Sequence, residues 1–318
     1  MRVLMIGLLA ALFFSVTFIL NRSMELEGGS WVWSASLRFF FMLPILLAIV
    51  GFQRKIKPVL IHLKNHPISW VVWSSVGFGL FYAPIAFATV YGPGWLVAAT
   101  FQLTIIAGSL LVPFLNKEQE LKQSIPLKSV FISAIILGGV ILMQMEHASS
   151  VPLASIWLCT IPLIISAFSY PLGNRKMMQI VGSDLHTFQR ILGMTIASMP
   201  FWLILSVYGA IAHGAPSSSQ LGQTFIVAVS SGVIATGLFF YATNLVKHDT
   251  QKLAGVEATQ SGEVVFALIG EIIFLHAAMP SPLSLLGVFL VIGGMVLHSL
   301  NSGAPRKEKT ETKLSNIN

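Results

Sequence analysis

Residues 3–20 read VLMIGLLAALFFSVTFIL, a run without a single charged side chain. An α-helix needs about 20 mainly apolar residues to cross the hydrocarbon core of a bilayer, so this run is long enough to span a membrane. The whole chain has a matching composition: 55% of its 318 residues are hydrophobic, 10% are charged, and the mean hydropathy is +0.80. Soluble domains carry roughly 25% charged residues. The sequence therefore predicts an all-α integral membrane protein.

Further apolar runs follow along the chain, and together they predict ten transmembrane helices. The expected spans cover residues 2–20, 30–51, 68–90, 94–115, 127–145, 152–173, 184–209, 222–245, 252–275 and 281–300. The connections between them are short, which is typical of antiparallel neighbours in a compact bundle. Residues 303–318 are polar and charged, and we expect them to form a disordered cytoplasmic tail.

The lysine and arginine residues indicate how the spans are oriented. With the N-terminus in the cytoplasm, 16 of the 19 fall in cytoplasmic segments, and only Arg22 falls outside. Cytoplasmic loops are enriched in these residues, so the pattern predicts that both the N-terminus and the C-terminus lie inside (N-in, C-in). We expect a bacterial-type plasma (inner) membrane. The same distribution accounts for the net charge of +7 without a nucleic-acid partner.

Short motifs of the first half of the chain recur in the second half at offsets of 152 to 158 residues. The pairs are Asn21-Arg22-Ser23-Met24 with Asn174-Arg175-Lys176-Met177, Arg38 with Arg190, Gly79-Leu80-Phe81-Tyr82 with Gly237-Leu238-Phe239-Phe240, Thr100-Phe101-Gln102 with Ala258-Thr259-Gln260, and Gly138-Gly139 with Gly293-Gly294. Each half, 1–146 and 147–302, holds five spans. Because five is odd, the second repeat enters the membrane from the opposite side. Inverted repeats of this kind are typical of secondary transporters.

These motifs resemble the drug/metabolite transporter superfamily, in its ten-helix (EamA-like) branch. The run Leu268-Ile269-Gly270-Glu271, followed by Gly287 and Gly293-Gly294, is similar to the repeat ending of that branch. Residues 21–26, 33–38 and 79–84 are most similar to a group known as multidrug resistance efflux transporters. The resemblance implies a secondary active exporter of cationic or amphipathic drugs and small metabolites. It also implies alternating access, with protons as the coupling ion.

One feature of the superfamily is missing from this chain. Its small four-helix members bind proton and drug in turn at a glutamate of the first helix, but the spans 2–20 and 152–173 contain no acid. The role must therefore fall to another ionisable residue, and such residues within a bilayer are costly and mark functional sites. The candidates inside the predicted spans are Arg38, Arg190, Glu257, Glu263 and Glu271.

Glu263 lies near the middle of the span 252–275, and we predict that it couples transport to protons. A carboxyl at that depth can take up and release a proton under physiological conditions. The alternative is a structural carboxyl that hydrogen-bonds to a neighbouring helix. Glu257, Gln260, Glu263 and Glu271 fall within one face of this helix, which we expect to look into the bundle.

The remaining intramembrane charges allow two interpretations. Arg190 and Glu257 are predicted near the cytoplasmic ends of their spans, and Arg38 and Glu271 lie towards the outer face, which places each pair to form a buried ion pair. Alternatively, an arginine receives a substrate carboxylate, because the guanidinium fork matches carboxylate geometry. The cargo would then be an amino acid or a related metabolite.

Polar and aromatic side chains in the spans are candidates for cargo binding. Gln102 and Gln260 occupy matching repeat positions, and we expect them to face each other, either as ligands for cargo or as links between helices. Phe14, Tyr82 and Phe240 are candidates for an aromatic cage around an organic cation. Their alternative role is ordinary packing.

Other classes of function find little support. The chain contains no HExxH, GxSxG, P-loop or dinucleotide-binding motif, so we expect no enzyme activity, no cofactor and no metal site. The single cysteine, Cys159, excludes an internal disulfide. A non-transport membrane scaffold is the alternative to a transporter, and we expect a monomer or homodimer whose partners are lipid, protons and a small-molecule substrate.

Overall fold

The computed structural model describes residues 2–115, 127–246, 252, 255–256 and 259–302. Every regular element within these residues is helical. The elements are α1 (Arg2–Leu26), α2 (Trp31–Phe52), α3 (Ile56–Asn65), α4 (Pro67–Ser74), η1 (Ser75–Gly79), α5 (Leu80–Tyr91), α6 (Gly94–Phe101), α7 (Thr104–Leu115), α8 (Leu127–Ser150), α9 (Leu153–Val181), α10 (Thr187–His213), α11 (Ser218–Val227), η2 (Ala228–Ala235), α12 (Thr236–Leu245), η3 (Thr259–Ser261), α14 (Gly262–Phe274) and α15 (Pro282–Ser302). The predicted all-α class is confirmed for this part of the chain.

Among the described residues, seven helices are long and apolar enough to cross a membrane. They are Arg2–Leu26, Trp31–Phe52, Pro67–Tyr91, Phe131–Ser149, Leu153–Val181, Thr187–His213 and Ser218–Leu245. Two further apolar helices, Gly94–Gly108 and Pro282–Leu297, are shorter. The chain is therefore a multi-pass membrane protein. The count of ten spans, the inversion of the halves and the N-in, C-in orientation stay predictions.

Four of the expected spans are not continuous α-helices: 68–90 and 222–245 contain the π-helical turns η1 and η2, and 94–115 and 252–275 contain other breaks. Between α6 and α7, Gln102 and Leu103 form a turn, and the Gln102 side chain donates 3.2 Å to the carbonyl of Ala98 near the end of α6. Ahead of α14, the described residues of the span 252–275 form the short 3-10 turn η3, where the Thr259 hydroxyl donates 2.6 Å to the carbonyl of Val256. Thr195 makes the same kind of bond, to the carbonyl of Ile191, inside the unbroken helix α10, so such bonds accompany the breaks without explaining them.

The sequence did not predict α3, which follows α2. This short helix buries Val59 and His62 and exposes Lys57 and Lys64. A helix with one apolar and one charged face lies at a surface, and it is too short to give the signal of a membrane span.

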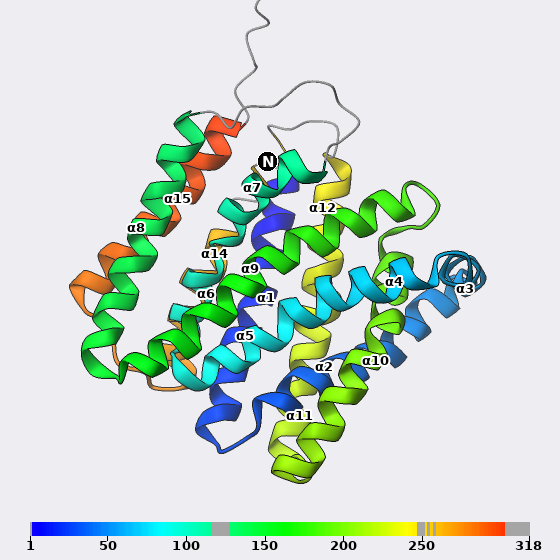
Figure 1. Cartoon of the computed structure of the whole chain (residues 1–318), viewed down its shortest axis with the longest axis horizontal. Helices are drawn as coiled ribbons and strands as arrows, with labels where there is room; N and C mark the ends of the chain where they lie inside the picture. The colour runs from blue at the N-terminus through cyan, green and yellow to red at the C-terminus, as the bar shows by residue number, and fades with distance from the viewer. Residues whose placement is uncertain (1, 116–126, 247–251, 253–254, 257–258, 303–318) are drawn as a thin grey trace, which may run out of the picture.

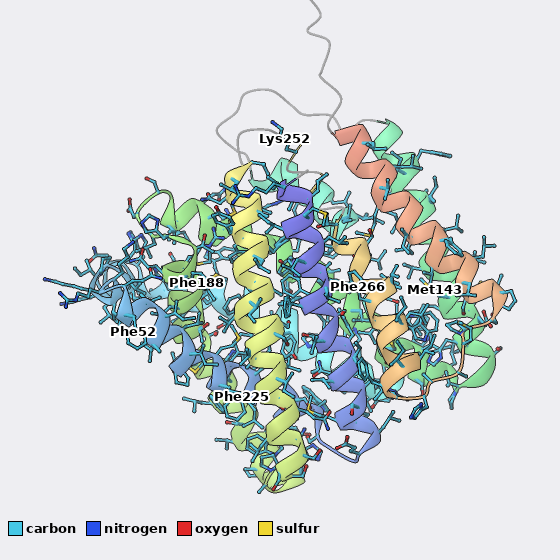
Figure 2. All side chains as sticks on the ribbon, turned by 180° about the vertical axis from the view of Figure 1, so that it is seen from behind. Phe52, Met143, Phe188, Phe225, Lys252 and Phe266 are labelled. Carbon is cyan, nitrogen blue, oxygen red and sulfur yellow. The ribbon has the colours of Figure 1, made fainter. Side chains whose placement is uncertain are left out.

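Helices from the two halves of the chain pack against each other. Helix α1 of the first half packs against η2 and α12 of the second half. Helix α9 of the second half packs against η1 and α5 of the first half. Three further pairs join the halves: α2 with α10, α6 with α14, and α8 with α15, which stand together at one edge of the bundle in Figure 1. Figure 2 shows α12, α1 and α14 side by side. The buried core therefore lies between the halves.

Two π-helical turns interrupt the bundle at similar positions of the two halves. The turn η1 ends at Gly79, and η2 ends two residues before Gly237. Each turn therefore leads into one copy of the recurring Gly-Leu-Phe motif. π-Helical turns occur frequently at functional sites, because the extra residue re-aims the side chains that follow. The side chains that follow here include Tyr82 and Phe240.

Candidate functional site

The Arg38 guanidinium lies in the core between α2, α5 and η2, and the residue is only 3% exposed. It donates 3.0 Å to the hydroxyl of Ser231 and lies 3.9 Å from the ring centre of Tyr82. The Tyr82 hydroxyl is in turn bonded to the side chain of Asn21 at 3.2 Å. Arg38 forms no ion pair with any described residue, and its Nε has no hydrogen-bond partner there. Arg38 is thus a buried cation held by a ring face and a hydroxyl.

Arg190 repeats this arrangement in the second half of the chain. Its guanidinium lies 4.4 Å from the ring centre of Phe240, and its Nε likewise has no hydrogen-bond partner in the described part of the chain. Arg190 matches Arg38 in the sequence repeat, and Phe240 matches Tyr82, so the two arginine–aromatic pairs are equivalent. Glu257, the predicted partner of Arg190, lies outside the described residues, and that ion pair stays a prediction.

The candidate aromatic residues do not gather into one cage. The rings of Tyr82 and Phe240 each face an arginine of the protein itself, and Phe14 packs edge-on against Phe239 at 6.2 Å. Tyr170 on α9 lies within electrostatic range of both guanidiniums. An organic cation therefore finds these two ring faces already occupied by a positive charge.

A cavity of about 790 Å³ opens beside Arg190. Aromatic side chains form part of its wall: Phe188, which lies beside α12 (Figure 2), and Phe240, whose ring faces the Arg190 guanidinium. Polar residues from the ends of α2 and α12 and from the segment between α9 and α10 also line it: Gln53, Ser183, His186 and Asn244. Ligand sites of small molecules commonly enclose about 300–1,000 Å³. The cavity thus has the size of a binding site, with one cation in a largely apolar wall.

A group of hydrogen bonds lies at the N-terminal end of α2, opposite the end that borders the cavity. Glu27, between α1 and α2, accepts 2.6 Å from the Ser219 hydroxyl and 2.8 Å from the Gln223 amide, both on α11. Gln220 of α11 donates 2.7 Å to the carbonyl of Ser30. We call these five residues the α1–α11 contact. They tie the first connection of the chain to the second half at the end of the bundle remote from the cavity.

The α1–α11 contact is expected to weaken in acid. Hydrogen bonds from Ser219 and Gln223 hold the pKa of the exposed Glu27 carboxyl below its usual value of 4.5. A depressed pKa contributes stability that is complete above pH 4.5 and lost as the pH falls through the lower value of the folded protein. Between pH 3 and pH 6, the Tm of the wild type should therefore depend more steeply on pH than that of Glu27→Gln. Parallel curves from thermal scans in detergent would contradict this expectation.

Glu263, the candidate for proton coupling, is buried on the first turn of α14 and is 4% exposed. The side-chain amide of Gln102, from the turn between α6 and α7, hydrogen-bonds to its carboxyl. Gln260 was expected to face Gln102, but its amide nitrogen has no hydrogen-bond partner among the described side chains. Gln102 therefore meets a carboxyl at this position, and its pairing with Gln260 stays a prediction.

Glu271 is buried near the start of α6. Its carboxylate accepts 2.6 Å from the backbone N–H of Gly94 and 3.4 Å from that of Trp95. The first N–H groups of a helix have no partner within the helix and carry partial positive charge, which accounts for this contact. The predicted ion pair between Glu271 and Arg38 is therefore wrong, because each residue faces different partners.

Sequence reasoning missed two residues that hold Arg38 in place. Asn21 stands in the first recurring motif, so the repeat carried a signal for it. Ser231 gave no such signal, because only the π-helical turn η2 brings its hydroxyl to the guanidinium. The structure also shows Tyr170 near both arginines, which no spacing in the sequence indicated.

Long apolar helices with charged side chains in the core between them define a multi-pass membrane protein of the transport type. The family model described as "EmrE: Putative multidrug resistance efflux transporter" matches residues 1–304. The chain belongs to this family, within the drug/metabolite transporter superfamily, and the resemblance inferred from its motifs is confirmed.

Similar proteins in other bacteria have no described function. The chain is 54% identical over 320 residues to "Uncharacterized protein YjlA" of Bacillus subtilis (strain 168), with 98% of each chain covered. It is 50% identical over 267 residues to an uncharacterised 42.1 kDa protein of Shouchella clausii, covering 83% of this chain and 70% of that protein. A solved structure described only as "Crystal structure of protein" matches with a TM-score of 0.65 at 14% identity, over 95% of this chain and 97% of that one. The last match shows the fold alone.

Proposed function

We propose that this protein is a secondary active transporter of the bacterial plasma membrane that exports amphipathic small molecules by alternating access, with protons as the coupling ion at Glu263. The carrying observation is the pairing of the Glu263 carboxyl with Gln102, both buried, where the α6–α7 segment is interrupted and α14 begins. In secondary transporters, interrupted helices near the middle of the membrane form the sites of substrate and coupling ion.

The packing of the helices supports two repeats with opposite orientation, spanning 1–146 and 147–302. Exchanging the halves turns the contact of α1 with η2 and α12 into that of α9 with η1 and α5. The contacts of α2 with α10 and of α8 with α15 map onto themselves. A pseudo-twofold relation of this kind, together with five expected spans in each half, favours the ten-span, inverted arrangement.

The two ends of the bundle differ in the way that alternating access requires. The cavity of about 790 Å³ beside Arg190 opens among the ends of α2 and α12, whereas the other end carries the α1–α11 contact beside a smaller pocket of about 390 Å³. In the N-in orientation favoured by the basic residues, the cavity faces the cytoplasm. The structure then corresponds to a state that receives cargo from inside, as an exporter needs.

Gln102 is suited to serve both protonation states of Glu263. Its amide nitrogen donates to the ionised carboxylate, and its amide oxygen, which is buried without a hydrogen-bond partner among the described residues, can accept from the protonated carboxyl. In the proposed cycle, Glu263 takes up one proton while open to the outside and releases it to the cytoplasm. The proton and the cargo thus cross in opposite directions.

Flux in proteoliposomes under an imposed pH gradient tests this proposal. Glu263→Gln keeps the hydrogen bond with Gln102 but removes the titratable group, so gradient-driven flux of a lipophilic cation or of an amino-acid mixture should fall to background. Glu25→Gln, at the last turn of α1, is the matched control and should keep wild-type flux. Gradient-driven flux that survives in Glu263→Gln would refute the coupling role.

A second candidate cargo is an amino acid or a related metabolite. The observation that favours it is Arg190, a cation in the wall of the cavity with no ion-pair partner among the described residues. In the flux experiment, the amino-acid mixture and the lipophilic cation separate the two candidates.

A further inference from the structure

A buried charge requires a counter-ion, and none of the described residues supplies one to the two core arginines. Neither Arg38 nor Arg190 forms an ion pair within the described part of the chain, and each leaves its Nε without a hydrogen bond. Removing a cation from water is costly, and a guanidinium cannot escape the cost by losing its proton. A ring face and one hydroxyl offset only part of it. Within the described residues, each guanidinium therefore keeps an N–H donor that a further acceptor can take.

We propose that Arg38 and Arg190 are two repeat-related binding sites for the carboxylate of an amphipathic cargo, exposed in turn to the two faces of the membrane. Arg190 receives the carboxylate from the open cavity, and Arg38 holds it when the opposite end opens. This inference rests on the proposed transport function and specifies its cargo as a monocarboxylate with an apolar or aromatic body.

The chemistry of the Arg190 cavity selects this class of cargo. The guanidinium presents parallel N–H donors that match the two oxygens of a carboxylate, whereas an organic cation would be repelled. Phe188 and Phe240 line the same cavity and offer apolar surface to the body of the cargo. The volume of about 790 Å³ leaves room for an aromatic acid beside the guanidinium.

Three observations connect the second site to the first. Arg38 rests on Tyr82 as Arg190 rests on Phe240, so both halves supply the same pair of groups. Only Arg190 lines the cavity, while Arg38 is buried. Tyr170 lies within electrostatic range of both guanidiniums, which places them in one continuous region of the core.

Binding of 3-phenylpropionate to the full-length protein in nanodiscs tests the open site. Its uncharged amide, 3-phenylpropionamide, has nearly the same shape, and we expect it to bind at least tenfold more weakly. Arg190→Gln should weaken binding of the acid at least tenfold, and Arg190→Lys should recover part of the loss. Arg54→Gln removes an exposed charge at the end of α2 and should leave the affinity unchanged. Equal affinities for acid and amide, or wild-type affinity in Arg190→Gln, would overturn the proposal.

Arg38→Gln tests the second site. Glutamine can keep the hydrogen bond to Ser231 while removing the unpaired charge, so the Tm should not fall and the affinity at the open cavity should stay within twofold. Flux of 3-phenylpropionate in proteoliposomes should nevertheless drop at least tenfold. A lower Tm together with weaker binding would assign Arg38 a structural role, and unchanged flux would exclude it from the route.

The coupling proposal and the carboxylate proposal can fail separately. If Glu263→Gln binds 3-phenylpropionate like the wild type, and the wild type shows no gradient-driven flux of any probe, proton coupling fails and the carboxylate sites stand. If the wild type transports only tetraphenylphosphonium under the gradient and does not bind the acid, coupling stands and the carboxylate sites fail.

Discussion

Gly173→Ala is expected to destabilise the protein by about 3 kcal/mol, because it forces α9 away from η1. A Cβ on Gly173 would overlap the backbone N and Cα of Gly77, and backbone atoms cannot move aside as a flexible side chain can. Overpacking commonly costs about 1–3 kcal/mol, and a backbone overlap belongs at the upper end of that range. At about 2–4 °C per kcal/mol, the Tm in detergent should fall by roughly 6–12 °C.

Two other glycines provide controls for this effect. A Cβ on Gly138 in α8 would meet nothing within 4 Å, so Gly138→Ala should leave the Tm unchanged or raise it slightly through the better helix propensity of alanine. A Cβ on Gly77 would approach Gly173 at 3.2 Å, so Gly77→Ala should cost less than Gly173→Ala. Equal stability of the three variants would show that α9 and η1 are not held at this distance.

The sequence predicts where helices occur better than it predicts where they are interrupted. Long apolar runs set the membrane class because no water-facing surface can be built from them, and the runs at 2–20 and 30–51 correspond to α1 and α2 with ends shifted by at most six residues. Hydropathy measures only how apolar a run of residues is. The breaks at Gln102 and at η3 fall inside apolar runs, so no apolar pattern could reveal them.

The sequence likewise predicted some features of the candidate site and missed others. The repeat identified Arg38 and Arg190 together with Tyr82 and Phe240, because equivalent positions in two halves carry equivalent groups. It did not identify which acid each arginine would meet, and Glu271 proved to bind the start of α6 instead. The depth of a residue in the membrane gives its position along one axis only. An ion pair also requires that the two side chains lie on the helix faces that pack against each other.

Glu271→Leu is expected to cost about 3 kcal/mol, because it leaves two backbone N–H groups at the start of α6 without an acceptor. Glu271 is 1% exposed, and its carboxylate is the acceptor for the N–H groups of Gly94 and Trp95. A buried donor that loses its acceptor costs about 1–3 kcal/mol, and leucine fills the space without replacing either bond. Thermal unfolding in detergent should show a Tm lower by roughly 6–12 °C.

Glu271→Gln separates this structural role from a role in coupling. The glutamine oxygen can still accept from Gly94, so the variant should lose less than half of the stability that Glu271→Leu loses, and gradient-driven flux should persist. Stability like the wild type combined with loss of that flux would instead make Glu271 a second proton carrier beside Glu263.

The two acids differ in their partners: Glu263 meets an amide that can donate or accept, whereas the N–H groups at Glu271 can only donate. Donors alone favour the ionised carboxylate, and for that reason we propose coupling at Glu263 and anchoring of α6 at Glu271.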